Sequence, residues 1–129
     1  MANLVKWAKQ NPPTVHKPMG YSHVARVGDL IILAGQVGRA PSGEVPPDVE
    51  SQTVRVFENI KACLEAEGAG LKDLAKVTIY ITDYKFKETV LKVRDRYLGG
   101  SLPTSMFVVC SALALPEYLV EVEGIAVAP

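Results

Sequence analysis

Two carboxylates near the end of the chain stand where they could take part in chemistry. Glu121 and Glu123 lie two residues apart in the apolar run Leu119–Val127, so in a β-strand both side chains point to the same face. A carboxylate among apolar neighbours is costly unless it is hydrogen-bonded, paired or functional. The pattern leaves three roles open for each glutamate: a solvated edge residue, an ion-pair partner at an interface, or a general base.

Three further side chains are candidates for the same site. Tyr21 and His23 alternate in an extended segment, which predicts that both point the same way and can exchange a proton with a nearby carboxylate. A Tyr–His pair hydrogen-bonded at a sheet edge is an equally good interpretation. Arg39 follows an apolar run at the mouth of a loop, where it can bind an anion or simply be solvated. His16 lies in a proline-rich arm, and we expect it at the surface.

The sequence lacks the motifs of several other kinds of site. Cys63 and Cys110 lie inside apolar runs without metal-ligand spacing, so we expect buried, unreactive thiols. Ser105 has no G-x-S-x-G elbow around it, and Gly35 belongs to no glycine-rich phosphate loop. The sequence therefore predicts no metal and no cofactor.

The composition is typical of one globular domain, which we take as residues 1–129. Hydrophobic residues make up 48% of the chain and charged residues 22%. Lys and Arg number 14, as do Asp and Glu, so the chain lacks the basic excess of a nucleic-acid-binding protein. No apolar run reaches transmembrane length, and the N-terminus lacks a signal-peptide core. We expect a cytoplasmic protein without membrane or nucleic-acid partners.

The periodicity of apolar residues predicts the elements that position these side chains. Tyr21–Val27 and Leu30–Val37 form an expected hairpin around a Gly-Asp turn, and the second strand is apolar enough to be covered on both faces. Val49–Glu67 has helical spacing behind an N-cap at Asp48. The other expected elements are an edge strand or extended arm before Pro18, strands at Asp73–Thr82, Met106–Cys110 and Leu119–Val127, and a helix from Asp83 to Gly99. This order predicts an α+β fold with two helices on one face of a mixed sheet.

The second face of that sheet has no cover from its own chain. In the last strand it presents Leu119, Ile125 and Val127 beside the two glutamates. Such a mixed apolar and acidic surface is poorly solvated, and another copy of the same sheet would cover it. We therefore expect a homo-oligomer.

Several motifs along the chain, in the same order, resemble those of the Rid family, also called YjgF-like, the reactive intermediate deaminases. They are LIILAGQVG, SGEVP, VTIYITD and RDRYLGGSLPTS…VEVEGIAV, and the resemblance runs from about Gly20 to Val127. It implies a chorismate-mutase-like α+β subunit in a homotrimer. The three sheets would form a central barrel, with the helices outside and small-molecule clefts between subunits.

The resemblance also implies site residues. It places a family glutamate at Glu123 and a cleft tyrosine at Tyr21, with the backbone of Gly35 beside the pocket. Ser105 stands where family members carry the arginine that clamps a substrate carboxylate, and Phe107 stands at a family cysteine position. A serine cannot make the paired hydrogen bonds of a guanidinium. The chain thus looks like the arginine-lacking branches, which include aminomuconate-type deaminases.

The leading hypothesis is a hydrolase that releases ammonia from a small enamine or imine of catabolism in an inter-subunit cleft. Glu123 would activate water, Tyr21 and Ser105 would supply hydrogen bonds, and Phe107 would form an apolar wall. The missing positive charge would come from His23 or Arg39. The alternative is a non-catalytic or chaperone-like trimer that binds a small acid. RNA cleavage is a third hypothesis, which the balanced charge disfavours.

Overall fold

The computed structural model describes residues 7–129, so the first six residues of the expected arm lie outside the described part. Its strands are β1 (Trp7–Gln10), β2 (Val24–Val27), β3 (Leu30–Val37), β4 (Leu74–Ile81), β5 (Thr104–Val109) and β6 (Val120–Val127). Its α-helices are α1 (Val49–Glu65) and α2 (Lys87–Leu98), and two short 3-10 turns are η1 (Leu71–Asp73) and η2 (Tyr84–Phe86).

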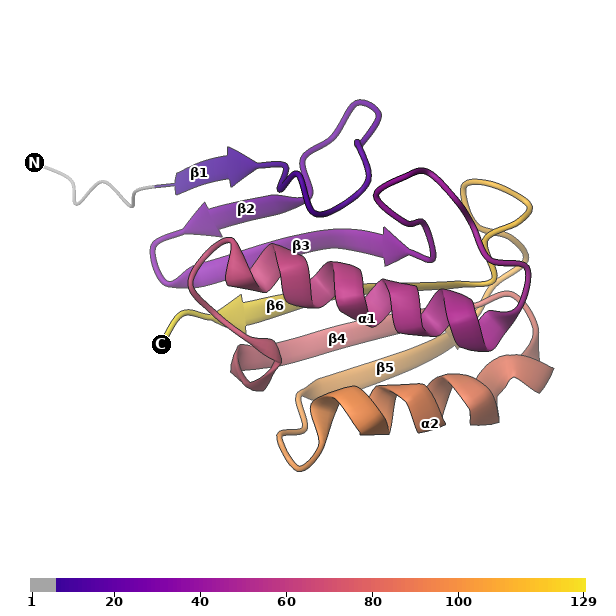
Figure 1. The fold of residues 1–129 in the computed structure, drawn as a ribbon. Helices are drawn as coiled ribbons and strands as arrows, with labels where there is room; N and C mark the ends of the chain where they lie inside the picture. Colours follow the sequence, from indigo (N-terminus) through magenta and orange to yellow (C-terminus); the bar gives the residue numbers. More distant parts are fainter. Residues whose placement is uncertain (1–6) are drawn as a thin grey trace, which may run out of the picture.

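The six strands form one mixed sheet in the order β1-β2-β3-β6-β4-β5, and both helices lie across the same face of it (Figure 1). β4 and β5 run parallel, and every other neighbouring pair is antiparallel. The last strand of the chain, β6, is inserted at the centre between β3 and β4. The predicted α+β fold is confirmed, and the strand with the two glutamates is central to it.

Helix α1 begins where the sequence predicts. The Asp48 side chain accepts a hydrogen bond from the backbone N–H of Ser51 at 2.8 Å, which satisfies one of the free donors of the first turn. The apolar face of the helix, with Phe57, Ile60 and Leu64, is completely buried on the sheet. Burial of side chains of this size is worth roughly 1.5–3 kcal/mol each, which exceeds what helix propensity alone supplies.

Helix α2 begins later than the sequence predicts. Asp83 caps the 3-10 turn η2, accepting from the backbone N–H of Lys85 at 2.9 Å, and the α-helix proper follows at Lys87. Val90 and Val93 then face the core. Gly99, with φ of 57°, ends the helix in a conformation that L side chains avoid.

The expected hairpin is present, although its first strand is shorter than predicted. Val27 pairs with Leu30, so Gly28 and Asp29 form a two-residue turn, and Gly28 has a φ of 61°. The strand begins at Val24, so Tyr21 lies in an irregular segment before it rather than within it. β1 pairs with β2 as the edge strand, as expected of the N-terminal arm.

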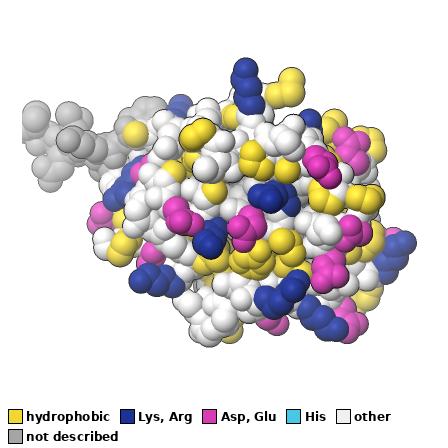
Figure 2. Space-filling view, viewed as in Figure 1, with side chains coloured by type: hydrophobic (Ala, Val, Ile, Leu, Met, Phe, Trp, Pro, Cys, Tyr) yellow, Lys and Arg dark blue, Asp and Glu magenta, His cyan; other side chains and the backbone are white. Residues whose placement is uncertain are grey.

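The open face of the sheet exposes apolar side chains. Leu30 is 45% exposed, Ile32 40% and Val127 46%, whereas alternate residues of the same strands, such as Ile31 and Ala126, are completely buried under the helices. The expectation that Leu30–Val37 is covered on both faces is wrong for the single chain, because both helices pack on one side. The helix-covered face, by contrast, carries interspersed charges of both signs around small apolar areas (Figure 2).

Candidate functional site

A β-bulge in β3 shapes the centre of the candidate site. Pairing with β6 jumps from Leu33–Gly124 to Gln36–Val122, so two residues, Ala34 and Gly35, oppose the single residue Glu123. Bulges of this kind bend a strand and redirect its side chains. Here the bulge leaves Gly35 against the carboxylate of Glu121.

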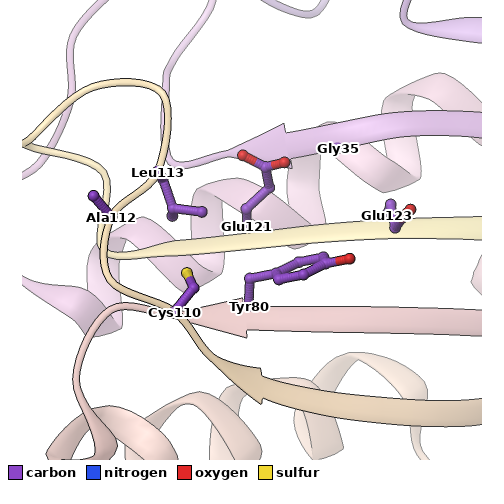
Figure 3. A pocket seen from close by; sticks show the side chains of 7 residues that line it. All are labelled: Gly35, Tyr80, Cys110, Ala112, Leu113, Glu121 and Glu123. Carbon is purple, nitrogen blue, oxygen red and sulfur yellow. The ribbon is translucent and has the colours of Figure 1, made fainter.

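Gly35 leaves room for the Glu121 carboxylate in the position that it occupies here. A Cβ atom added to Gly35 would lie 2.8 Å from the Glu121 Cδ atom, which is closer than real Cβ contacts. Figure 3 shows the Glu121 carboxylate directed toward β3 beside Gly35, with Tyr80 and Cys110 on the other side of the hollow. The cavity there has a volume of about 330 Å³, and Glu123, Ala112 and Leu113 complete its lining.

A larger cavity of about 570 Å³ shares Gly35 and Glu121 with the first. Its other polar residues include Tyr21, Arg39 and Tyr118, and Met19, Ala114 and Leu115 provide an apolar rim. The Arg39 Nη1 atom donates to the Tyr118 hydroxyl at 2.9 Å. The guanidinium is thus held at the cavity wall by a buried phenol.

The cavity perturbs the acid–base properties of two of its residues. Burial raises the pKa of Glu121, and the neighbouring charge of Glu123 raises it further. Burial also raises the pKa of Tyr21, with smaller contributions from Tyr118 and Glu121. At neutral pH, Tyr21 is therefore a phenol that can donate or accept a hydrogen bond. A carboxylate with a raised pKa is suited to proton transfer.

Two buried amides of α1 fix the loops that bring Arg39 and Tyr118 together. Gln52 donates to the carbonyls of Pro46 and Glu117, both at 2.8 Å, and accepts from the Leu119 N–H at 2.9 Å. Asn59 donates to the carbonyl of Arg39 at 3.0 Å. Gly38 makes room for Gln52, since a Cβ there would lie 2.6 Å from the Gln52 Cβ.

The two histidines lie next to Tyr21, and His16 is part of the lining of the larger cavity. His23 is completely buried; its Nε2 is 2.7 Å from the His16 carbonyl and its Nδ1 is 3.0 Å from the Gln36 amide nitrogen. His23 is therefore close to Tyr21, with ring centroids 5.5 Å apart, but does not line either cavity. The expectation that His16 is at the surface is wrong: it is 4% exposed, because the proline-rich arm folds over the end of the sheet.

The structure separates the two glutamates that the sequence pairs. Glu121 lines both cavities, whereas Glu123 lines the smaller one and a neighbouring hollow with Ile32 and Lys76. Glu123 lies on the same open face but two residues farther along β6, away from Tyr21 and Arg39. The role expected for Glu123 stays a prediction.

Ser105 and Phe107 are not brought to these cavities within one chain. Both belong to the edge strand β5, which is separated from β6 by β4. Phe107 pairs with the buried Ile79 and packs against the helix-side core, with the Lys87 ammonium 6.0 Å from its ring centre. Contact of either residue with a ligand beside Glu121 therefore needs a second copy of the chain.

Sequence reasoning missed Tyr118 and His16 and undervalued Glu121. Tyr118 lies in a loop with no periodic signal, and His16 in an arm whose path depends on tertiary packing. Glycine at position 35 is a usable signal for Glu121, because a glycine inside a strand often marks a bulge. Cys63 is buried as expected, which raises its pKa to about 12. Cys110 is only half-buried and lines the smaller cavity.

Among residues 7–129, no group of three or more His, Cys, Asp or Glu side chains is placed to hold a metal ion. No helix in this part of the chain is both long and apolar enough to cross a membrane.

Residues 12–128 match the family model described as endoribonuclease L-PSP. The chain belongs to this family. It is the family of the Rid proteins: the structure of RidA from an Antarctic Psychrobacter superposes with a TM-score of 0.86 at 28% identity, covering 98% of this chain and 99% of that one. The predicted relationship is confirmed.

Two curated relatives of this Rid family member show how close the relationship is. A RutC family protein of Pyrococcus abyssi is 43% identical over 129 residues, covering 98% of each chain. The 2-iminobutanoate/2-iminopropanoate deaminase of Escherichia coli is 32% identical over 123 residues, covering 93% of this chain and 94% of that protein. Deaminases are thus among the relatives, at moderate identity.

Proposed function

We propose that this Rid family member hydrolyses a small imine or enamine that carries a carboxylate, with release of ammonia. One observation carries the proposal: a single cavity is lined by a cation, Arg39, and by Glu121, a carboxylate with a raised pKa. The cation suits an anionic substrate, and the carboxylate suits proton transfer. The deaminase relative from E. coli supports the same reaction class.

Glu121 moves protons in both halves of the reaction. Water adds to the carbon of the protonated C=N bond while Glu121 takes one of its protons, which leaves a neutral carbinolamine. Glu121 then gives this proton to the nitrogen and takes the proton of the carbinolamine hydroxyl as the C–N bond breaks, so that the carbonyl product and ammonia leave and the last proton is released from Glu121. Because its pKa is raised, Glu121 titrates closer to neutral pH, where it can both accept a proton and give it back.

Arg39 is the proposed clamp for the substrate carboxylate, in place of the arginine that Ser105 replaces. Its guanidinium can pair with a carboxylate through two parallel hydrogen bonds, even while Nη1 also donates to Tyr118. We assign the base to Glu121 rather than Glu123 because only Glu121 shares the larger cavity with Arg39 and Tyr21.

A homotrimer is part of the proposal. The exposed Leu30, Ile32 and Val127 on the open face support burial against other copies. Met106 on the edge strand β5 is 62% exposed and extends the same apolar area. Ser105 and Phe107 share the face of β5 that pairs with the buried Val77 and Ile79, so their expected roles in the site stay predictions.

The test uses imines made in place by an L-amino-acid oxidase, with semicarbazide as a trap for the free imine. An active deaminase lowers the rate of semicarbazone formation and raises the rate of ammonia release. We expect Glu121→Gln to lower kcat by about 10²-fold or more, as for loss of a general base. Arg39→Gln should mainly raise KM, and Glu123→Gln should have the smallest effect.

The matched variants separate the possible results. If Glu123→Gln loses all activity and Glu121→Gln remains active, the general base is Glu123. If the unmodified protein leaves the trapping rate unchanged for aliphatic, aromatic and unsaturated substrates, the hydrolase proposal is wrong. Saturable binding of small carboxylates in that case would support the non-catalytic binding alternative, for which the replacement of an arginine by Ser105 is the favouring observation.

A further inference from the structure

The cation of the larger cavity has no acidic partner in the described part of the chain. No Asp or Glu side chain of residues 7–129 forms an ion pair with Arg39, whereas Arg26 and Arg94 each have one. The guanidinium of Arg39 makes one hydrogen bond within these residues, from Nη1 to the Tyr118 hydroxyl at 2.9 Å. Because a guanidinium carries five N–H donors, most of them remain available to an anion in the cavity.

Both members of this pair are fixed through their backbones. The Arg39 carbonyl accepts a hydrogen bond from the Asn59 amide at 3.0 Å. The Tyr118 N–H donates to the Leu115 carbonyl at 3.1 Å, and Tyr118 is only 7% exposed. Gln52 binds the peptide groups on both sides of Tyr118. Guanidinium and phenol are therefore already in place at the cavity wall, which lowers the entropy cost of binding a ligand there.

The direction of the hydrogen bond between them follows from the chemistry of arginine. A guanidinium N–H can only donate, so the Tyr118 oxygen is the acceptor. The hydrogen of the phenol itself needs another acceptor, and none of residues 7–129 provides one within hydrogen-bonding distance. Since Tyr118 lines the larger cavity, its O–H is available to a ligand there.

The bond from Arg39 also makes this hydroxyl a stronger donor. A hydrogen bond accepted by the phenol oxygen polarises its O–H, and the donor here is a cation. The acceptors that gain most are ionised oxygens, because charge-assisted hydrogen bonds are roughly twice as strong as neutral ones. A carboxylate has two such oxygens. Donors on neighbouring groups, a guanidinium and a phenol 2.9 Å apart, therefore suit a carboxylate with one oxygen on each.

We propose that Tyr118 is a substrate-binding residue, which accepts an N–H of Arg39 and donates its own O–H to the substrate carboxylate. This inference rests on the proposed function, because it adds a second arm to the Arg39 clamp. Tyr21 and Glu121, which line the same cavity, are then left for the C=N bond. The pair selects carboxylates over uncharged compounds of the same shape.

Calorimetric titration with 2-oxobutanoate, a keto acid of the kind that the proposed reaction releases, tests the pair without any need for catalysis. We expect Tyr118→Phe to weaken the binding of 2-oxobutanoate about tenfold, the worth of one hydrogen bond to a charged group. The uncharged 2-oxobutanamide should bind more weakly, and equally to both proteins. Equal affinities of the two proteins for 2-oxobutanoate, or no binding of it to the unmodified protein, would overturn the proposal.

A weaker affinity would also follow if Tyr118 only held Arg39 in place, and a crystal structure with 2-oxobutanoate separates the two roles. The proposal expects the Tyr118 hydroxyl oxygen at about 2.5–2.7 Å from one carboxylate oxygen, the range of a short O–H···O⁻ bond. A carboxylate bound to Arg39 alone, with the Tyr118 oxygen more than about 3.5 Å away, would contradict donation by Tyr118.

A second variant pair separates the same roles in solution. Arg39→Lys keeps the positive charge but replaces the planar fork by a compact ammonium, which needs no orientation by Tyr118. In this background, Tyr118→Phe should still weaken the binding of 2-oxobutanoate severalfold, because the phenol donates to the carboxylate itself. A loss that disappears in the Arg39→Lys background would show that Tyr118 acts only through the guanidinium.

Kinetics in the imine assay supply a further readout. Tyr118→Phe should raise KM with little change in kcat, because the carboxylate takes no part in bond breaking and is held equally in the ground state and the transition state. A fall in kcat at unchanged KM would contradict the assigned role.

Tyr97→Phe is the matched control, since it removes a phenol hydroxyl outside the cavity that donates to Glu58 at 2.8 Å. It should leave the binding of 2-oxobutanoate unchanged, and thermal unfolding of the two variants separates loss of folded protein from loss of the carboxylate contact. If the unmodified protein is inactive on imines but binds 2-oxobutanoate as described, the proposed function fails and the role of Tyr118 in carboxylate binding stands.

Discussion

At the scale of single residues, Glu121 combines a stability cost with a chemical use. Its carboxylate lies against Gly35 in the middle of the sheet, partly removed from water and near a second carboxylate. Holding it ionised there costs folding free energy, which is the physical meaning of its raised pKa. Functional groups are often kept at such a cost.

Replacing this carboxylate should therefore stabilise the protein at neutral pH. Because the pKa of Glu121 is higher in the folded chain than the ordinary 4.5, its contribution to stability is complete below about pH 4.5 and is lost as the pH rises through the raised value. We expect Glu121→Gln to raise the unfolding midpoint relative to the unmodified protein at pH 7–8. The difference should shrink below pH 4.5.

Unfolding midpoints measured from pH 4 to pH 8 check this expectation. Glu65→Gln is a suitable control, because Glu65 is an exposed carboxylate of α1. A midpoint for Glu121→Gln that stays below that of the unmodified protein over the whole range would show that the carboxylate stabilises the fold.

At the scale of elements, helix α1 does more than cover the sheet. Its Gln52 side chain joins the loop before the helix to the loop before β6, with all three of its hydrogen bonds made to backbone groups of those loops. These loops carry Arg39 and Tyr118, which meet across the cavity at 2.9 Å. Gln52 thus links two segments that are far apart in the sequence through a single buried amide.

Gln52→Leu should keep the volume of the side chain and remove these bonds. Each buried backbone group left without a partner costs about 1–3 kcal/mol, and we expect a loss of about 3 kcal/mol in the free energy of unfolding, since the loops can relax toward water. The affinity of the larger cavity for small carboxylates should fall as well. Urea unfolding measures the first effect, and Thr53→Val, the neighbouring buried residue, is the control. Equal losses in the two variants would show that the three Gln52 hydrogen bonds add no more to the free energy of unfolding than the single Thr53 hydrogen bond.

At the scale of the whole molecule, the sheet has one covered and one open face. The helix side shows mixed charges, which suit a solvated exterior, and offers no broad basic area for RNA (Figure 2). The open side exposes Leu30, Ile32 and Val127, which suits burial between copies. The proposed trimer would cover this open face, on which Glu121 and Glu123 also lie.

A charge in the centre of the open face should disrupt this assembly. We expect the unmodified protein to have a mass in solution of three times the 14.0 kDa chain, and Ile32→Glu to shift it toward the single chain, because a carboxylate buried between sheets lacks a partner. Light scattering after size-exclusion chromatography measures the mass. Tyr84→Glu is the control, since Tyr84 is 69% exposed in the turn before α2. A single-chain mass for the unmodified protein would rule out the trimer.

Much of the fold was predictable from the sequence alone. The Gly-Asp turn, the cap at Asp48 and the alternation in β6 are local signals, and each produced the expected element. The errors at β2 and α2 fall at element ends, where Tyr21 lies in an irregular segment and Asp83 caps a 3-10 turn rather than the α-helix. Such ends depend on neighbouring contacts that local periodicity does not contain.

The sequence alone places the site on one face of β6 but does not locate it along the strand. Alternation places Glu121 and Glu123 on the same side of β6, and no local rule distinguishes them. The tertiary structure distinguishes them, because the bulge at Gly35 and the loops carrying Arg39 and Tyr118 meet at Glu121. The same packing folds the proline-rich arm over His16 and turns an expected surface residue into a buried partner of Tyr21.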